Sequence, residues 1–576
     1  MLFRAIVIFS NWIVSIKNSF FESIYFKCAL IIKSPRDLLI PIKLIADGNP
    51  YVGRRLVDGY YVFGGVELDS GSEHPWFIET PSREVEFSLH GFSWLNDLAS
   101  VGTTKSKKIA VELITKWENI YANGKKFSWD PEITALRTLN LIINWDFFGK
   151  YLGRNQNRCL ITLNRQYFFL KLIANHIPSG FTKIKVMYSI LILSISYDES
   201  VRFKNKVANK LCRVISRHVD SKVFLVSRNP EELSKCFFII NELLEKNKEK
   251  AILLSKSNLK IMRDLTVRIA PILRGLLLGD GFLTRTHGGD MGSLELITKY
   301  LNMANVKGKA SIKNLMGFER VTAGRLVLIV DCGKPMFNNR KISYHGSCLG
   351  FELTSGQRPI FVNCGPGARF GTDFKKYCRD TYAHNSCILE NFSQLEYRLI
   401  SRESRWPEEI TVGGPKNVTV DRQKTLEATW LELSNDTFEE DYGYMHFRKL
   451  FMLNTGKVFK GTDCFEITRP KVIDKTRAKN FYAFFQLHPD VELWDHPRLQ
   501  TIILRLKNGE HWIFEVDLGE VKVEDSVFID TKRARLAKTN RIVIKSPDLY
   551  NKAEIKWSLR RREIVTRNTR DTELVV

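Results

Sequence analysis

CLGFELTSGQRPIFVNCG, residues 348–365, has the pattern of a β-hairpin. Two runs rich in aromatic and aliphatic residues flank a short Ser-Gly turn, which is typical of paired antiparallel strands. Strands that follow one another with no intervening helices indicate a large antiparallel sandwich. The same pattern recurs in GRLVLIVDCG (324–333), HFRKLFMLNTGKVFKG (446–461), TIILRLKNGEHWIFEV (501–516) and NRIVIKS (540–546).

The first half has a different period. Its apolar residues recur every three or four positions, as in Ile133, Leu136, Leu139 and Ile143, which predicts amphipathic helices. Short connections between the helices indicate stacked antiparallel hairpins, which either close into an α/α toroid or stay open as an α-solenoid. We expect the toroid. The clearest helical segments span 159–176, 182–197, 203–218, 231–246 and 257–277.

These two patterns predict a two-part α+β protein, for which we expect an N-terminal α/α toroid followed by a C-terminal antiparallel β-sandwich. The length of 576 residues exceeds what one hydrophobic core normally holds, which supports the division. We expect a lead-in over 1–82, the toroid over 83–315 and the sandwich over 316–576.

The formal net charge of +24 indicates an acidic partner. A surface this basic concentrates polyanions by long-range attraction, although a general Lys-rich composition explains the charge equally well. The sequence contains no RNP signature, zinc-finger spacing or Walker loop. We therefore expect an acidic polysaccharide as partner and no nucleic acid.

Ten cysteines occur without any Cys-x-x-Cys pair, which argues against a zinc ribbon or a thioredoxin-like site. Half of them fall between 332 and 387, where either a disulfide or buried free thiols fit the pattern. We expect the thiols, because buried strands accommodate small apolar groups.

The first 21 residues, MLFRAIVIFSNWIVSIKNSFF, fit a weak signal peptide or an amphipathic surface helix. The apolar run Val186–Ile195 is too short to span a bilayer. We expect no integral membrane segment.

Three stretches of the second half carry a resemblance to a known family. They are SYHGSCLGFEL (343–353) with QRPIFVNCG (357–365), YCRDTYAHNS (377–386) and FQLHP (485–489). With the layout of helices before strands, they resemble the C-terminal domain of heparinase II/III-like polysaccharide lyases over 320–560. The first half resembles one bacterial branch of that family in LHGFSWLNDL (89–98), LVSRNP (225–230) and LRGLLLGDGFLTRTHGG (273–289).

The resemblance implies a metal site, often zinc, at His345, Asn363 and His384. Family members hold the metal with two His and one Asp, a donor set that suits Zn²⁺. Asn363 replaces that Asp with a weaker neutral ligand, and Ser343 replaces a further His. The alternative is that the two imidazoles form hydrogen bonds inside the sandwich.

The resemblance also implies a catalytic group. A uronate lyase neutralises the C6 carboxylate, removes the C5 proton and protonates the departing O4 oxygen. Asn175 and His176 match the family's Asn-His pair, and Arg379 and His384 complete the predicted catalytic set. The alternative for Asn175-His176 is a polar helix end before a proline.

The family's catalytic Tyr has no counterpart, because Glu232 stands at the matching place. The remaining candidates are Tyr188, Tyr197 and Tyr382, of which we place Tyr382 in the substrate-binding set. Arg228 joins it there, since a guanidinium binds carboxylate or sulfate bidentately. His287 is the third predicted substrate-binding residue. A surface or interdomain ion pair is the alternative role for Arg228 and for Arg379, and a structural role is expected for His446 and His488.

These features predict a lyase that cleaves an acidic polysaccharide by β-elimination. The alternative function is a non-catalytic glycan-binding or envelope-assembly protein with a degenerate site, which the replacements at 343, 363 and 232 favour. By resemblance we expect the bacterial cell envelope or periplasm, with peripheral association, and the cytoplasm is the alternative location.

Overall fold

The computed structural model describes residues 23–562 apart from 43, 45–47, 70–72, 125, 221, 309, 311–314, 337–343, 402–407, 470–478 and 497–499. The chain forms two compact units. The first consists of Met1–Val223, Lys235–Arg268 and Asp530–Arg535, and the second of Phe224–Ser234, Ile269–Ile529 and Leu536–Val576. The chain therefore passes between the units several times. The domains expected from the sequence are contiguous and contain no such crossings.

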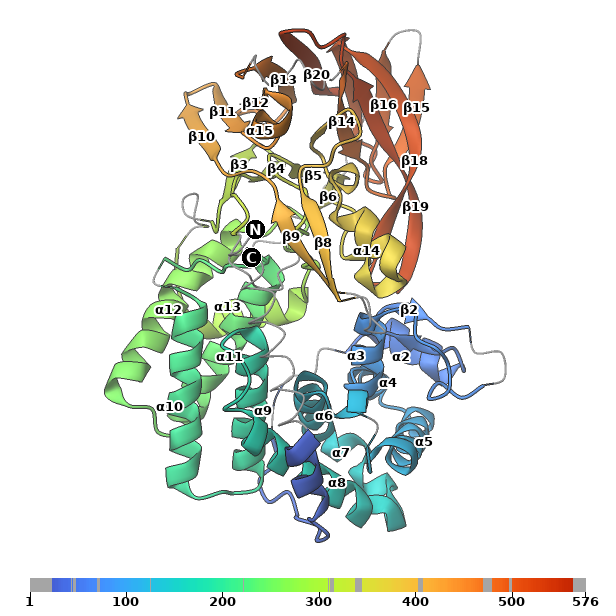
Figure 1. The fold of residues 1–576 in the computed structure, drawn as a ribbon, viewed down its shortest axis with the longest axis vertical. Helices are drawn as coiled ribbons and strands as arrows, with labels where there is room; N and C mark the ends of the chain where they lie inside the picture. Colours follow the sequence, from blue (N-terminus) through green and yellow to red (C-terminus); the bar gives the residue numbers. More distant parts are fainter. Residues whose placement is uncertain are drawn as a thin grey trace. The chain divides into compact units, whose positions relative to one another are not determined.

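The first unit is helical (Figure 1). A small hairpin of β1 (Val62–Phe63) and β2 (Val66–Glu67) lies near its start. Residues 23–30 are helical, and the named helices are α2 (Pro50–Val57), α3 (Arg83–His90), α4 (Trp94–Val101), α5 (Thr104–Tyr121), α6 (Pro131–Ile143), α7 (Trp145–Phe148), α8 (Gln156–Ile173), α9 (Phe181–Ser196), α10 (Val201–His218), α11 (Pro230–Lys248) and α12 (Lys256–Gly275).

Side-chain caps set the starts of several helices. The Asp130 carboxylate accepts from the backbone N–H groups of Glu132 and Ile133 at the start of α6, and the Ser200 hydroxyl accepts from Phe203 at the start of α10. Helix α9 is buried on nearly all sides, and both α6 and α10 pack against it. The five helices predicted most clearly from the sequence correspond to α8 through α12.

The second unit contains the remaining strands, whose recorded pairings are all antiparallel. They form an eight-stranded sheet in the order β10-β11-β12-β13-β20-β17-β16-β15, four-stranded sheets in the orders β18-β19-β14-β7 and β3-β4-β5-β6, and the pair β8-β9. The first ten strands are β3 (Phe318–Ala323), β4 (Leu326–Asp331), β5 (Phe351–Ser355), β6 (Arg358–Phe361), β7 (Cys387–Leu389), β8 (Glu396–Ser401), β9 (Glu408–Gly413), β10 (Val418–Lys424), β11 (Ala428–Asn435) and β12 (Tyr444–Leu453). The others are β13 (Val458–Ile467), β14 (Phe481–Gln486), β15 (Glu492–His496), β16 (Thr501–Arg505), β17 (His511–Leu518), β18 (Glu520–Asp530), β19 (Arg535–Lys545) and β20 (Lys552–Arg562).

Aromatic side chains join these sheets into one core. Trp557 on β20 packs against Phe485 on β14 and Phe351 on β5, with ring centroids 4.9 and 6.0 Å apart. Residues from the eight-stranded sheet and from both four-stranded sheets belong to the same buried cluster. Because each sheet buries its apolar face against another, the layers stabilise one another.

The predicted hairpins are confirmed. Residues 348–365 contain β5 and β6 around Gly356, and 446–461 contain β12 and β13. One expectation was wrong, because the helix α14 (Thr372–Arg379) interrupts the strands between β6 and β7. The shorter α15 (Glu439–Tyr442) lies between β11 and β12, and α13 (Leu294–Ala304) precedes β3. Helix α14 has few buried residues, so its apolar pattern is too short to stand out from the loops.

All ten cysteines are free thiols, nine of them buried, as the sequence suggested. In the part of the chain that the structure describes, no helix combines the length and the apolarity that a bilayer crossing needs. The N-terminal stretch, for which a signal peptide or surface helix was expected, lies outside the described residues.

Close packing at Gly461 on β13 provides a test of this core. A Cβ atom there would lie 2.1 Å from the Trp557 indole, which is itself held among four other aromatic rings. We expect Gly461→Ala to destabilise the protein by about 1–3 kcal/mol, because the indole has no room to move. Urea unfolding followed by tryptophan fluorescence measures the change.

Gly180→Ala is the matched control, because no atom lies within 4 Å of the Cβ position at Gly180. A loss of stability at Gly461 no larger than the loss at Gly180 would contradict the packing described for Trp557.

Candidate functional site

A buried carboxylate organises the candidate site in the β unit. Asp331 lies at the end of β4 and is 3% exposed. Its Oδ2 accepts a 2.7 Å hydrogen bond from the Ser347 hydroxyl and lies 3.2 Å from Nε2 of His287, while Oδ1 pairs with the Arg228 guanidinium. Three segments distant in sequence therefore meet at one side chain.

Arg228 uses its donors within the protein. Its Nε donates to the Met316 carbonyl at 2.9 Å, and its Nη1 and Nη2 donate to the Gly333 and Gly317 carbonyls at 2.7 and 3.0 Å. Gly333 has to lack a side chain, because a Cβ atom would lie 2.4 Å from Cζ of Arg228. The predicted carbohydrate contact of Arg228 stays a prediction, and its ion pair with Asp331 is buried within the second unit, unlike the surface or interdomain pair that was the alternative.

His287 occupies a strained turn. Its φ of 51° and the φ of 77° at Gly288 are both left-handed, a conformation that few residues other than glycine adopt readily. Gly289 follows, where a Cβ atom would lie 2.4 Å from the Asn229 side-chain oxygen. The turn holds the imidazole so that Nδ1 accepts a 3.3 Å hydrogen bond from the backbone N–H of His345, which leaves the proton on Nε2, toward Asp331.

His345 and His384 lie beside each other, with ring centroids 5.4 Å apart, and His345 lies 6.4 Å from His287. Nδ1 of His384 is 2.9 Å from Oδ1 of Asn363, whose Nδ2 donates to the Arg285 carbonyl at 2.9 Å. Because Asn363 can only accept at Oδ1, the His384 proton is on Nδ1 and its Nε2 carries the lone pair. The structure thus brings together His287, His345, Asn363 and His384, here called the imidazole group.

Burial keeps the imidazole group neutral. It lowers the pKa of His384 to about 3, assisted by the charge of His287 and opposed by Asp331 and the Cys378 carbonyl. Burial and the neighbouring His384, His287 and Arg379 likewise lower the pKa of His345 well below its ordinary value. Burial alone would raise the pKa of Asp331, but Arg228 and His287 hold it well below its usual range. At neutral pH the imidazoles of the group are therefore uncharged and lie beside the ionised carboxylate of Asp331.

Several polar atoms of this region make no hydrogen bond with any described residue. They are Nδ1 of His345, Nε2 of His384, and Nε and Nη2 of Arg379. Arg379, at the end of α14, directs Nη1 to Glu409 at 2.8 Å and stacks on the Tyr397 ring. These atoms are the ones available to a ligand, because buried polar groups normally find partners.

The other predicted residues have separate surroundings. Tyr382, half-buried in the short turn before His384, packs against Phe484. Asn175 and His176 belong to the helical unit, where the Lys210 ammonium donates to Asn175 and the Tyr25 hydroxyl lies 2.8 Å from Nε2 of His176. They are therefore not members of the imidazole group, and Ser343 lies outside the described residues.

The predicted zinc ligands do not fit a metal. The oxygen of Asn363 accepts from His384 and its nitrogen donates to the Arg285 carbonyl, so the amide is engaged with the protein, and a neutral amide is a weaker zinc ligand than a carboxylate. The amide instead orients His384 from behind, as partners of metal-bound imidazoles commonly do. Two imidazole nitrogens alone do not make the four-coordinate site that structural zinc requires.

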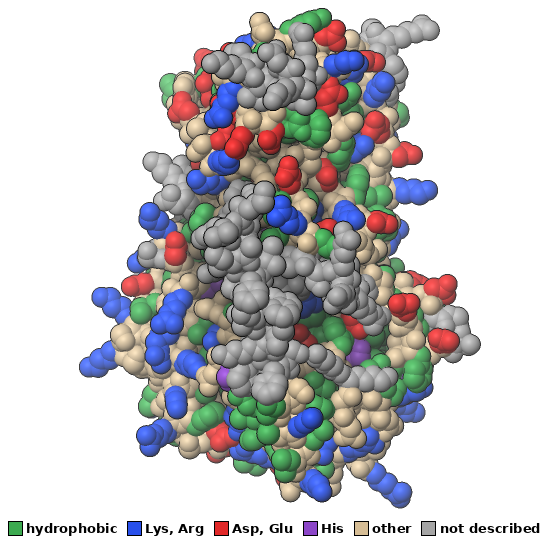
Figure 2. Space-filling model, in the orientation of Figure 1, with side chains coloured by type: hydrophobic (Ala, Val, Ile, Leu, Met, Phe, Trp, Pro, Cys, Tyr) green, Lys and Arg blue, Asp and Glu red, His purple; other side chains and the backbone are tan. Residues whose placement is uncertain are grey.

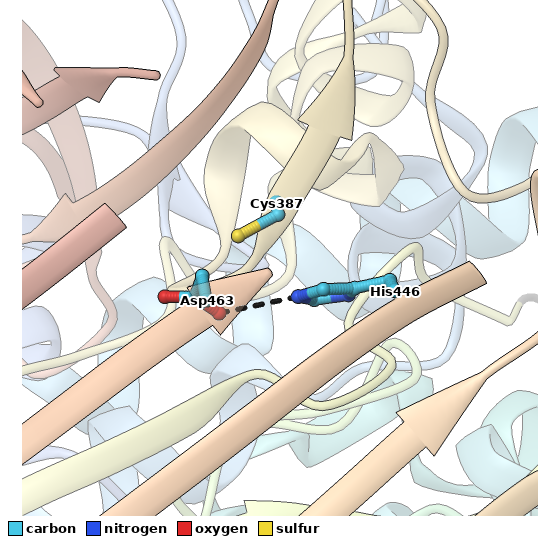
Figure 3. A group of neighbouring side chains, drawn as sticks. All are labelled: Cys387, His446 and Asp463. Carbon is cyan, nitrogen blue, oxygen red and sulfur yellow. Dashed lines mark hydrogen bonds and ion pairs between the residues drawn. The ribbon is translucent and has the colours of Figure 1, made fainter. Parts of the chain in front are cut away.

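A second buried cluster has the residue types of a metal site, and sequence analysis missed it (Figure 3). Ligand atoms of Cys387, His446 and Asp463 lie within 4.8 Å of one another. A guanidinium already supplies the positive charge, since Nε of Arg448 donates to Asp463 at 2.6 Å and Nη2 approaches the Cys387 sulfur at 3.5 Å. The cluster is therefore a structural ion network, consistent with the role expected for His446.

The comparisons with known proteins agree with this architecture. Residues 312–558 match the heparinase II/III-like C-terminal domain. The chain superposes on crystal structures of heparinase III (TM-score 0.65, 12% identity, 91% of this chain and 87% of that one) and of the heparan sulfate lyase HepC from Pedobacter heparinus (TM-score 0.50, 13% identity, 95% and 88%). Residues 312–558 therefore form a heparinase II/III-like C-terminal domain, and the chain has the α/α toroid and β-sandwich of the heparinase III fold.

A curated relative extends the likeness along the chain. FtsZ-localized protein C of Caulobacter vibrioides is 22% identical over 530 residues, which cover 89% of this chain and 88% of the relative.

The neutrality of His384 predicts a dependence of stability on pH. In the unfolded chain its ordinary pKa is 6.5, but the folded pKa is about 3, so the unfolded state binds the extra proton between these values. Stability should therefore fall as the pH drops below 6.5, with His384 accounting for about 2 kcal/mol between pH 7 and pH 5. In urea unfolding at both pH values, His384→Gln should show a correspondingly smaller loss.

His511→Gln, which changes a partly exposed histidine of β17, is the control and should keep the wild-type pH dependence. An identical pH dependence in wild type and His384→Gln would rule out a neutral, buried His384.

Proposed function

We propose that this protein cleaves a uronate-containing polysaccharide by β-elimination at the imidazole group. The observation that carries the proposal is the orientation of His384, because Asn363 holds its Nδ1–H and leaves the Nε2 lone pair without a partner among the described residues. A neutral imidazole with an oriented lone pair is suited to remove the C5 proton. The polysaccharide-lyase fold supports the same reaction class.

Arg379 and Tyr382 are suited to the other two tasks. The free Nε and Nη2 donors of Arg379 are arranged to pair with a C6 carboxylate, and a guanidinium does so in a bidentate way. Burial raises the pKa of Tyr382, so its phenol stays protonated at neutral pH and can donate to the departing oxygen. Asn175 and His176 join the catalytic set by family resemblance alone.

A second candidate function is glycan binding without cleavage. His345, His384 and Arg379 are only 6%, 1% and 3% exposed, so little of the imidazole group reaches solvent. Asn363 stands where family members have the metal-binding Asp, and Glu232 stands where they have the catalytic Tyr. These features favour a protein that retains the fold and has lost the chemistry.

We also propose a location at the bacterial cell envelope with peripheral association. The relative's name places that protein with FtsZ, and the basic charge of this chain favours an acidic envelope polymer.

A product assay separates the two functions. The protein is incubated with pectate, alginate, hyaluronan and heparan sulfate, and ultraviolet absorbance reports the unsaturated uronate that β-elimination forms. We expect product from at least one polymer, and a fall in rate of about 100-fold or more in His384→Gln, because a general base contributes at least that factor. His511→Gln should keep the wild-type rate.

Binding without product from any polymer would replace the lyase with the glycan-binding function. Neither binding nor product would reject both.

A further inference from the structure

Helix α10 carries a stripe of positive charge. Its sequence, VRFKNKVANKLCRVISRH, contains six Lys or Arg residues and no Asp or Glu. Five of the six recur at intervals of four, four, three and four residues, which places them along one side of a helix. This group, here called the α10 stripe, consists of Arg202, Lys206, Lys210, Arg213 and Arg217.

The stripe is on the outer side of the helix. Four of its members are exposed and Lys210 is half-buried, whereas Val207, Leu211 and Ile215 on the other side are buried within the helical unit. From the first to the last member, the 15 steps of 1.5 Å along the helix span about 22 Å. Figure 2 shows Lys and Arg side chains gathered over the part of the surface where Figure 1 shows α10 and α12.

No member of the stripe forms an ion pair with a described residue, although the sixth cation of the helix, Lys204, pairs with Asp198 at 2.9 Å. Elsewhere on the surface, bases commonly have an acidic partner, as Lys449 has Glu432 and Arg505 has Glu492. Cations spaced by one helical turn without acids between them destabilise the helix by a few tenths of a kcal/mol per pair. The stripe is thus an uncompensated array rather than part of a charge-balanced surface.

A neighbouring helix extends the array. Lys183 on α9 has its pKa lowered by burial and then by the charges of Lys210 and Arg217, so these three cations lie close enough to repel one another. Lys210 also donates to the Asn175 side chain, which brings an exposed amide to the edge of the array. An anion bound between them would relieve the repulsion.

We propose that the α10 stripe, with Lys183, binds a linear carboxylated polysaccharide that lies along the helix. The evenly spaced cations suit a polymer with regularly repeated charge, and the identity of that polymer rests on the proposed function. The nearby Phe181 ring is stacked with His218, with centroids 6.1 Å apart, and no aromatic residue of α10 is among the exposed large hydrophobic ones, so the array lacks the platforms on which nucleic-acid bases stack. The apolar side of α10 is buried, so it has no face to insert into a lipid surface.

The test compares two full-length variants that each lose four positive charges. The stripe variant is Arg202→Gln, Lys206→Gln, Arg213→Gln and Arg217→Gln combined, and the control variant is Lys105→Gln, Lys424→Gln, Lys460→Gln and Lys538→Gln combined, all at exposed residues. Binding to immobilised polygalacturonate is measured over a range of salt concentrations, and circular dichroism checks that both variants fold.

We expect the stripe variant to bind about tenfold more weakly than the control, because each lost surface pairing contributes a few tenths of a kcal/mol. Its slope of log affinity against log salt should also be shallower by about 3, as the loss of four contacts to a linear polyanion predicts. Equal affinities and slopes for the two variants would overturn the proposal. So would tighter binding of the wild type to single-stranded DNA, or to phosphatidylglycerol vesicles, than to polygalacturonate.

The product assay is independent of this measurement. Binding that depends on the stripe, without product, would reject the lyase function and support the stripe as a binding site. Product formation that the stripe variant retains at full rate and affinity would support the lyase function and reject the stripe as a binding site.

Discussion

The buried Asp331 carboxylate is the constraint on which the candidate site depends. A carboxylate removed from water costs several kcal/mol unless charged and polar partners surround it. Arg228, His287 and Ser347 supply those partners from segments that begin about 100 residues before the carboxylate and end 16 residues after it. None of these segments can shift without exposing an unpaired charge, so the interaction fixes the backbone that carries His287 and His345.

A buried carboxylate surrounded by an Arg, a His and a further hydrogen-bond donor occurs twice in the β unit. Asp463 is completely buried, and Arg448, His446 and Trp557 surround it much as Arg228, His287 and Ser347 surround Asp331. In both places an Arg balances the carboxylate and the adjacent histidine stays neutral, because burial outweighs the attraction of the acid and lowers the histidine pKa. The two networks differ in their surroundings, since only the one at Asp331 adjoins imidazole nitrogens that lack partners among the described residues.

Much of the fold was predictable because it depends on local periodicity. The β5–β6 and β12–β13 hairpins combine apolar runs with glycine turns, and α8 through α12 show the helical repeat clearly. The grouping of His345, Asn363 and His384 followed from family resemblance. Asp331 was not singled out, although it ends a buried strand, because its partner Arg228 is 103 residues away.

Contacts between distant segments also explain why residue roles were harder to predict. The sequence shows that Asn363 replaces an acid, but only the coordinates show that both ends of its amide are occupied, by His384 and by Arg285. For the α10 stripe, the spacing of the basic residues is visible in the sequence. The lack of acidic partners among the described residues becomes apparent only in the structure.

The most direct test of the account is a double-mutant cycle on Arg228 and Asp331. Urea unfolding would be measured for wild type, Arg228→Gln, Asp331→Asn and the double variant. Each single change should destabilise the protein by about 3–5 kcal/mol, because it leaves one buried charge without its partner. The double variant should be more stable than the sum of the single effects implies, by about 2–3 kcal/mol. Single effects that add to within about 0.5 kcal/mol would contradict the claim that this ion pair holds the site together.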